Sequence, residues 1–259
     1  MTIQRFNLLK KYCIPVGARA SAMVLTSMSS QSAGDLLVAP TRVVLDGQRG
    51  TVVILNNIGS ATATYRISLE LRRMTSDGRL EEVGEEEANE IEQAAQAMIR
   101  YAPRRVTLPP NQPQAIRLGI RAPEGLKDGE YRAHILFRAI PEARTVTDQK
   151  IPEGGFTIAL TTIYGVTIRV IVRQGNLHAT AAIANGKMEQ DPDGQALTFE
   201  LSRSGERSTY GEIRVTKPGL NEPVMVARGI AVYPEVDRRK VVLPVPPEVA
   251  AQLKGPVSV

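Results

Sequence analysis

Cysteine, histidine and tryptophan are scarce or missing in this 259-residue sequence, and each shortage excludes a class of chemistry. The single cysteine is Cys13, so we expect no disulfide framework. The two histidines, His134 and His178, have no Cys, Asp or Glu neighbours at metal-ligand spacing. With so few candidates for a nucleophile, general base or metal ligand, we expect a protein that is not an enzyme and uses no cofactor and no metal.

Motifs that mark nucleotide or ester chemistry are also missing. The sequence contains no G-x-S-x-G elbow, no P-loop and no dinucleotide fingerprint. Gly154-Gly155 precedes an expected strand, so these glycines do not place a phosphate at a helix N-terminus. A glycan-processing enzyme or carbohydrate-binding module stays open as an alternative, but it needs carboxylate pairs or aromatic platforms, and the absence of Trp disfavours the latter.

The positive charge of the chain is confined to its beginning. The formal net charge is +5, and residues 1–33 carry four basic residues and no acid. Removing those four leaves 28 basic against 27 acidic residues, so we expect no nucleic-acid partner. The basic segment ends at Arg19, and a short apolar run, Ala20–Met28, precedes several small residues. This order predicts a cleaved signal peptide over residues 1–33; the alternative is a disordered cytosolic N-terminus.

Residues that favour strands and turns dominate the remaining chain. Apolar residues recur at every second position, as in a half-buried strand; Thr62–Arg72, for example, places Tyr65, Ile67, Leu69 and Leu71 in one row. Further strands are expected at 36–45, 51–56, 104–108, 114–121, 130–138, 177–184, 196–201, 212–216, 224–232 and 240–245. Only Gly84–Arg100 shows helical spacing, and we interpret its many glutamates as a solvated face of a short surface helix rather than a cation site.

These elements predict an all-β protein of two antiparallel immunoglobulin-like β-sandwich domains in tandem, with one short helical insertion in the first. We expect the N-terminal domain to span residues 34–173 and the C-terminal domain residues 174–259. Gln174-Gly175-Asn176 is the expected hinge between them.

The stretch Phe156–Arg173 combines a strand pattern with an aggregation hazard. Phe156, Ile158 and Leu160 alternate with the small residues Thr157 and Ala159, and the second half is almost continuously β-branched, interrupted by Gly165 and Arg169. An edge of this length and β-propensity has to be covered. We therefore expect the protein to present this edge to another protein.

Several segments together resemble the periplasmic pilus (fimbrial) chaperones, the PapD-like proteins of the chaperone–usher pathway. The similar segments occur in the family's order: Ala39–Gly47, Asn56-Asn57 after a Val/Ile strand, Arg105–Gln112 with Ile116–Leu118, Glu130–Pro141, and Ile158–Leu160 with Ile168–Arg173. The resemblance covers most of residues 36–173 and only loosely the rest. It implies a periplasmic chaperone that binds pilus subunits and delivers them to an outer-membrane usher, with self-association in the absence of subunit as a further expectation.

The resemblance also implies roles for individual residues. Arg42 and Arg169 match the two cleft cations that hold the C-terminal carboxylate of a subunit. Phe156, Ile158 and Leu160 match the donor strand that completes the subunit's sheet. Glu130 and Arg173 match two members of an interdomain ion pair.

One departure from the family pattern concerns the spacing before Arg169. Leu160 and Arg169 are nine residues apart, whereas the family commonly has a basic residue about five positions beyond the last donor residue. A bulge or insertion around Ile163–Gly165 is the expected cause. The alternatives are a surface role for Arg42, an ordinary core row at Phe156–Leu160, and a structural or adhesive immunoglobulin-like module without chaperone activity.

Overall fold

The computed structural model describes residues 35–46, 50–141, 163–192, 194–253 and 258–259. In this part of the chain β-strands dominate, and they form two sandwiches, so the predicted fold class is confirmed. The predicted signal peptide and the donor row Phe156, Ile158 and Leu160 lie outside the described residues. No described helix is long and apolar enough to cross a membrane.

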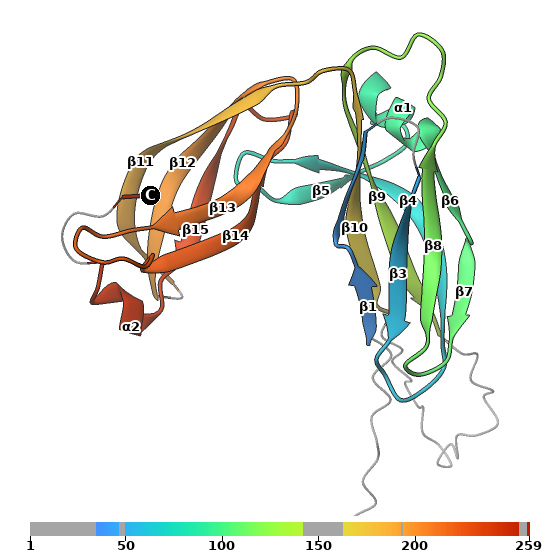
Figure 1. Cartoon of the computed structure of the whole chain (residues 1–259), viewed down its shortest axis with the longest axis horizontal. Coiled ribbons are helices and arrows are strands. Elements are labelled where there is room, and N and C mark those ends of the chain that lie inside the picture. Colours follow the sequence, from blue (N-terminus) through green and yellow to red (C-terminus); the bar gives the residue numbers. More distant parts are fainter. Residues whose placement is uncertain (1–34, 47–49, 142–162, 193, 254–257) are drawn as a thin grey trace, which may run out of the picture. The chain divides into compact units, whose positions relative to one another are not determined.

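The first sandwich has two sheets (Figure 1). One sheet has the order β1 (Leu36–Ala39), β3 (Thr51–Asn57), β8 (Pro113–Ile120), β6 (Ile99–Ala102). The other has the order β2 (Arg42–Asp46), β10 (Gly165–Gln174), β9 (Gly129–Ile140), β4 (Ala63–Met74), β5 (Leu80–Val83), and β7 (Arg105–Leu108) also pairs with β4. This division of strands is that of an immunoglobulin domain.

The expected strand 36–45 is two strands, and the prediction of one was wrong. β1 pairs antiparallel with β3 in one sheet, whereas β2 pairs with β10 in the other. Pro40 lies between them, where its missing N–H prevents a continuous ladder. The pairing of β2 with β10 is parallel, so the second sheet is mixed and not purely antiparallel as predicted.

Alternation along each strand separates a core face from an outer face. The predicted row on β4 points inward: Tyr65, Ile67 and Leu71 are buried in the first core, and Leu69 packs against it. On β10 the residues Ile168, Val170 and Val172 are buried in the same core. The intervening residues of β2, β9 and β10 therefore point to the outer face.

Helix α1 (Glu90–Met98) is shorter than the predicted segment 84–100 and begins with a capping box. The Asn89 side chain accepts from the Glu92 backbone N–H, and the Glu92 carboxylate accepts from the Asn89 N–H. Ala95 and Met98 are buried against the first core, whereas Ile91 is exposed. Glu92 is buried, and its carboxylate also forms an ion pair with Arg73 at 2.7 Å.

The second sandwich contains fewer strands. One sheet has the order β11 (Ala179–Asp191), β12 (Gly194–Gly205), β15 (Arg238–Pro244), and the other pairs β13 (Thr209–Val215) with β14 (Met225–Val232). Phe199, Val215 and Val232 lie in its core. A second short helix, α2 (Pro247–Ala250), was not predicted from the sequence.

A third apolar cluster joins the two sandwiches. It consists of Met74, Ile171, Ala231 and Tyr233, with Val44 packed against it. Ile171 and Val44 come from the outer face of the first sandwich, and Tyr233 directly follows β14 of the second. The polar residues that flank this cluster form the candidate site. The predicted domain boundary after Arg173 stays a prediction.

Candidate functional site

The outer face of the mixed sheet carries a row of polar residues that sheet pairing places side by side. Arg42 on β2 pairs with Arg169 on β10, Arg169 pairs with His134 on β9, and His134 pairs with Glu70 on β4. Paired residues of neighbouring strands point to the same face, and the strands are about 4.8 Å apart. Four segments far apart in sequence thus contribute adjacent side chains.

Arg42 and Arg169 are therefore two adjacent like charges. No hydrogen bond or ion pair joins either guanidinium to another residue in the described part of the chain, and the Nε of each is buried without a partner. Both side chains are only partly buried, so solvent reaches them. Adjacent like charges on a sheet are destabilising unless an anion lies between them.

Arg42 is positioned by the second sandwich. Its guanidinium lies 4.5 Å from the ring centroid of Tyr210 on β13, a cation–π contact. Burial lowers the pKa of Arg42, and the charge of Arg173 acts in the same direction, whereas Tyr233 raises it. The group still carries its charge, because arginine is not deprotonated in proteins.

His134 lies next to Arg169 and is buried, with only 2% of its surface exposed. Neither ring nitrogen has a hydrogen-bond partner among the described residues. Burial lowers its pKa to about 3, and the positive charges of Arg132, Arg72 and Arg169 add to this effect. The imidazole is therefore neutral at neutral pH and provides one N–H donor.

Tyr233 faces this row from the second sandwich. Its ring packs against Ile171, and its side chain is almost completely buried. The hydroxyl has no hydrogen-bond partner among the described residues. Burial raises the pKa of the hydroxyl, and the charges of Arg169, Arg132 and Arg42 oppose this rise. We call Arg42, Arg169, His134 and Tyr233 the unpaired cluster.

A second set of polar residues on the same face is joined to the second sandwich by the ion pair between Arg132 and Glu235. Arg132 binds both carboxylate oxygens of Glu235 and donates to the Arg72 carbonyl at 2.8 Å. Its guanidinium also lies 3.7 Å from the Tyr233 ring centroid. The side chain of Arg132 is 5% exposed, and burial raises the pKa of Glu235 despite the neighbouring charge. This is a buried, structural contact.

Glu130 and Arg173, which the family resemblance matched to an interdomain ion pair, are joined within the first sandwich, so their interdomain role stays a prediction. Arg173 Nε lies 3.1 Å from Glu130 Oε2, and the two residues pair across β9 and β10 of one sheet. The same oxygen accepts from the Ser208 backbone N–H at 3.1 Å and the Ser208 hydroxyl at 2.9 Å. The contact between the sandwiches is thus made through Ser208. We call Glu130, Arg132, Arg173, Ser208 and Glu235 the paired cluster.

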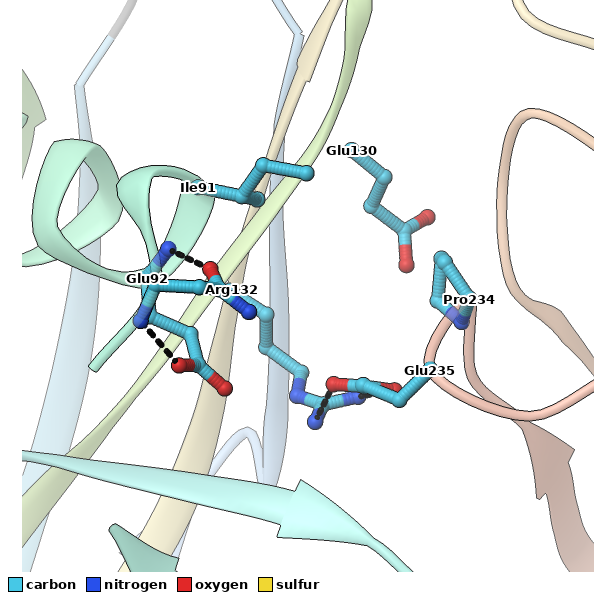
Figure 2. A pocket seen from close by; sticks show the side chains of 7 residues that line it. Ile91, Glu92, Glu130, Arg132, Pro234 and Glu235 are labelled. Atoms are coloured by element: carbon cyan, nitrogen blue, oxygen red, sulfur yellow. Dashed lines mark hydrogen bonds and ion pairs between the residues drawn. The ribbon is translucent and has the colours of Figure 1, made fainter. Parts of the chain in front are cut away.

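Figure 2 shows a pocket of about 230 Å³ beside the paired cluster. Its lining consists of Asn89, Ile91, Glu92, Glu130, Arg132, Pro234 and Glu235. In the figure the Arg132 guanidinium binds the Glu235 carboxylate, and the backbone N–H of Glu92 donates to the Asn89 side chain at the start of α1. The two candidate cations, Arg42 and Arg169, do not line this pocket.

The structure thus brings together four of the predicted residues on one face, in two pairs: Arg42 with Arg169 and Glu130 with Arg173. The expected bulge at Ile163–Gly165 does not interrupt β10, whose register with β9 runs unbroken from Gly165 to Gln174. Residues 35–46, 50–141, 163–192, 194–253 and 258–259 contain no group of His, Cys, Asp and Glu that could hold a metal ion.

Sequence reasoning missed the partners that complete both clusters: Arg132, His134, Ser208, Tyr233 and Glu235. One signal was present. Along β9, the polar residues Glu130, Arg132 and His134 alternate with the buried Tyr131, Ala133 and Ile135. Such a row in a central strand has to face another polar surface. Nothing in the sequence indicated which residues of the second sandwich would meet it.

Comparison with known proteins gives structural matches but no sequence family. No protein-family model and no curated protein matches the chain. The chain is similar to the CsuC–CsuE chaperone–tip adhesion subunit pre-assembly complex of Acinetobacter baumannii (12% identity, 82% of this chain and 88% of that chain, TM-score 0.46). It is also similar to the E. coli chaperone DraB (14% identity, 86% and 88%, TM-score 0.41). Because both TM-scores are below 0.5, the function proposed below is based on the site alone.

Proposed function

We propose that this protein is a periplasmic, non-enzymatic assembly chaperone that binds pilus subunits and passes them to an outer-membrane usher. The site holds the C-terminal carboxylate of the subunit between Arg42 and Arg169. One observation carries the proposal: Arg42 and Arg169 are neighbours on the same face of two paired strands, partly exposed to solvent, with no counter-charge bound among the described residues.

A carboxylate is the ligand that this geometry favours. Two arginines offer paired N–H donors to its two oxygens, and hydrogen bonds between charged groups are roughly twice as strong as neutral ones. The chain terminus of a partner protein fits this arrangement.

The proposed donor strand is a separate part of the mechanism. Phe156, Ile158 and Leu160 precede β10 in the chain, and β10 carries Arg169. The proposed donor segment and the proposed carboxylate site are therefore close to each other in sequence. In this proposal their apolar side chains fill the open groove of the subunit. Replacing Ile158 with Asp should abolish subunit stabilisation, because a charge enters an apolar groove only at high cost.

Capture of a co-expressed subunit tests the carboxylate site. The pilus subunits of the source organism are expressed one at a time with the tagged protein, and the captured yield is compared between wild type and Arg42→Ala. We expect a loss of at least roughly tenfold, because a charged hydrogen-bond partner is removed. Arg117→Ala is the matched control, since it removes the same charge from an exposed position on β8 in the other sheet.

Two results would contradict the proposal. An undiminished yield with Arg42→Ala would exclude the role of this cation. Equal binding of a synthetic peptide from the subunit's C-terminus as free acid and as amide would exclude carboxylate recognition. The second result is the one expected of a structural or adhesive immunoglobulin-like module.

A further inference from the structure

The hydroxyl group of Tyr233 is the least explained polar group of the unpaired cluster. The side chain is 1% exposed, yet its hydroxyl oxygen has no hydrogen-bond partner in the described part of the chain. A buried hydroxyl without a partner destabilises its own protein, because it has lost its hydrogen bond to water without gaining another acceptor. A phenylalanine would fill the same apolar contact with Ile171 without that cost.

The surroundings of this hydroxyl are those of an anion site. The charges of Arg169, Arg132 and Arg42 all act on it, and of these Arg132 is already bound to Glu235. Arg42 and Arg169 have no hydrogen-bond or ion-pair partner among the described residues. Tyr233 packs in one cluster with Ile171 and Val44, which lie two residues after Arg169 and Arg42 on the same face of their strands. Its O–H is therefore a third donor beside the position where an anion would bind the two guanidinium groups.

We infer that Tyr233 donates its hydroxyl proton to the anion bound by Arg42 and Arg169, so that the second sandwich supplies a direct contact to the ligand. This inference rests on the proposed function, because it takes the anion to be the terminal carboxylate of a subunit. A carboxylate has about four acceptor positions on two oxygens. A neutral hydroxyl can therefore occupy one of these positions beside the two guanidinium groups.

The inference has a consequence for both states of the protein. In the free protein the hydroxyl is a buried donor without an acceptor, whereas in the complex it gains one. Tyr233→Phe should therefore leave the melting temperature of the free protein equal to or above that of wild type, because the cost of the unpaired hydroxyl is removed. The same substitution should weaken subunit binding, because the complex loses a hydrogen bond to a charged group.

The test measures binding of a synthetic peptide that matches the C-terminal segment of the captured subunit, prepared as the free acid and as the amide. For the free acid, Tyr233→Phe should bind roughly 10- to 100-fold more weakly than wild type. Tyr131→Phe is the matched control: it removes the hydroxyl of another buried tyrosine, one that donates to the Lys127 carbonyl at 2.8 Å and belongs to neither cluster. Its affinity should equal that of wild type.

The amide peptide separates a direct contact from a packing effect. If Tyr233 contacts the carboxylate, the effect of Tyr233→Phe should shrink when the amide replaces the acid; equal effects on both peptides would overturn the inference. Wild-type affinity of Tyr233→Phe together with weakened binding by Arg42→Ala would also overturn it, while the proposed function would stand. Wild-type affinity of Arg42→Ala would overturn both.

Discussion

The paired and unpaired clusters lie next to each other between the same two sandwiches and each contains two arginines, but they differ in whether those arginines bind a carboxylate. In the paired cluster, Arg132 binds Glu235 and Arg173 binds Glu130, whose carboxylate also accepts from Ser208. In the unpaired cluster, Arg42 and Arg169 have no bound carboxylate among the described residues.

The difference indicates that the paired cluster stabilises the structure and that the unpaired cluster binds a ligand. A buried charge that is joined to an opposite charge holds the structure in one arrangement, and its removal leaves the partner unpaired. A charge that has no partner contributes little to folding and is free for a ligand. Substitutions in the two clusters should therefore affect different measurements, stability in the first and binding in the second.

The largest effect on stability is expected from Arg132→Ala. This substitution leaves the Glu235 carboxylate, whose pKa burial already raises, without its partner, and it removes the cation over the Tyr233 ring. The free energy of unfolding, measured by urea denaturation, should fall by about 3–5 kcal/mol. Arg238→Ala is the control, since Arg238 pairs with Glu200 but is 70% exposed, and it should cost at most about 0.5 kcal/mol. Equal losses would contradict the comparison.

His134 should make stability depend on pH. Its pKa falls from 6.5 to about 3 on folding, so between these values the unfolded chain binds a proton that the folded protein does not. The contribution is fully present above pH 6.5 and is lost as the pH decreases toward 3, by up to about 1.4 kcal/mol per pH unit. Urea denaturation of wild type and His134→Phe at pH 7.5, 6 and 5 measures the difference. Parallel curves for the two proteins would contradict the prediction.

A smaller effect is expected from Ser208→Ala. Glu130 then loses the hydroxyl donor at 2.9 Å but keeps the Ser208 backbone N–H and Arg173. The free energy of unfolding should decrease by about 0.5–1.5 kcal/mol, with peptide binding unchanged. Ser202→Ala removes an exposed hydrogen bond to the Ala182 carbonyl and should have almost no effect. Weaker peptide binding by Ser208→Ala would show that the two clusters are not separate.

The strand pattern of the fold could be predicted from the sequence because side-chain alternation along a strand is local. The row on Thr62–Arg72 was located correctly, and most other strands were found within a few residues of their bounds. The short strands β5 and β6 were missed: β5 has the sequence LEEV, which contains little apolar alternation, and β6 begins at Ile99, inside the segment 84–100 that was predicted as a helix. The switch of sheets between β1 and β2 was missed because hydrophobicity does not tell which sheet a strand joins.

Only part of the candidate site could be predicted from the sequence. The resemblance to pilus chaperones indicated Arg42, Arg169, Glu130 and Arg173, but as separate positions in the chain. That Arg42 and Arg169 are neighbours follows from the parallel pairing of β2 with β10, a contact between segments more than 120 residues apart. The partners from the second sandwich, among them Tyr233, were identified only from their burial and contacts in the structure.

The sequence by itself determined the class of the fold and the absence of catalytic motifs, because composition and alternation are properties of neighbouring residues. Tertiary structure decided which charges are paired and which are free, because pairing depends on side chains that meet across strands and between sandwiches. Arg132 and Arg169 show the difference most directly: both are arginines on the outer face of one sheet, yet only Arg132 meets a carboxylate among the described residues.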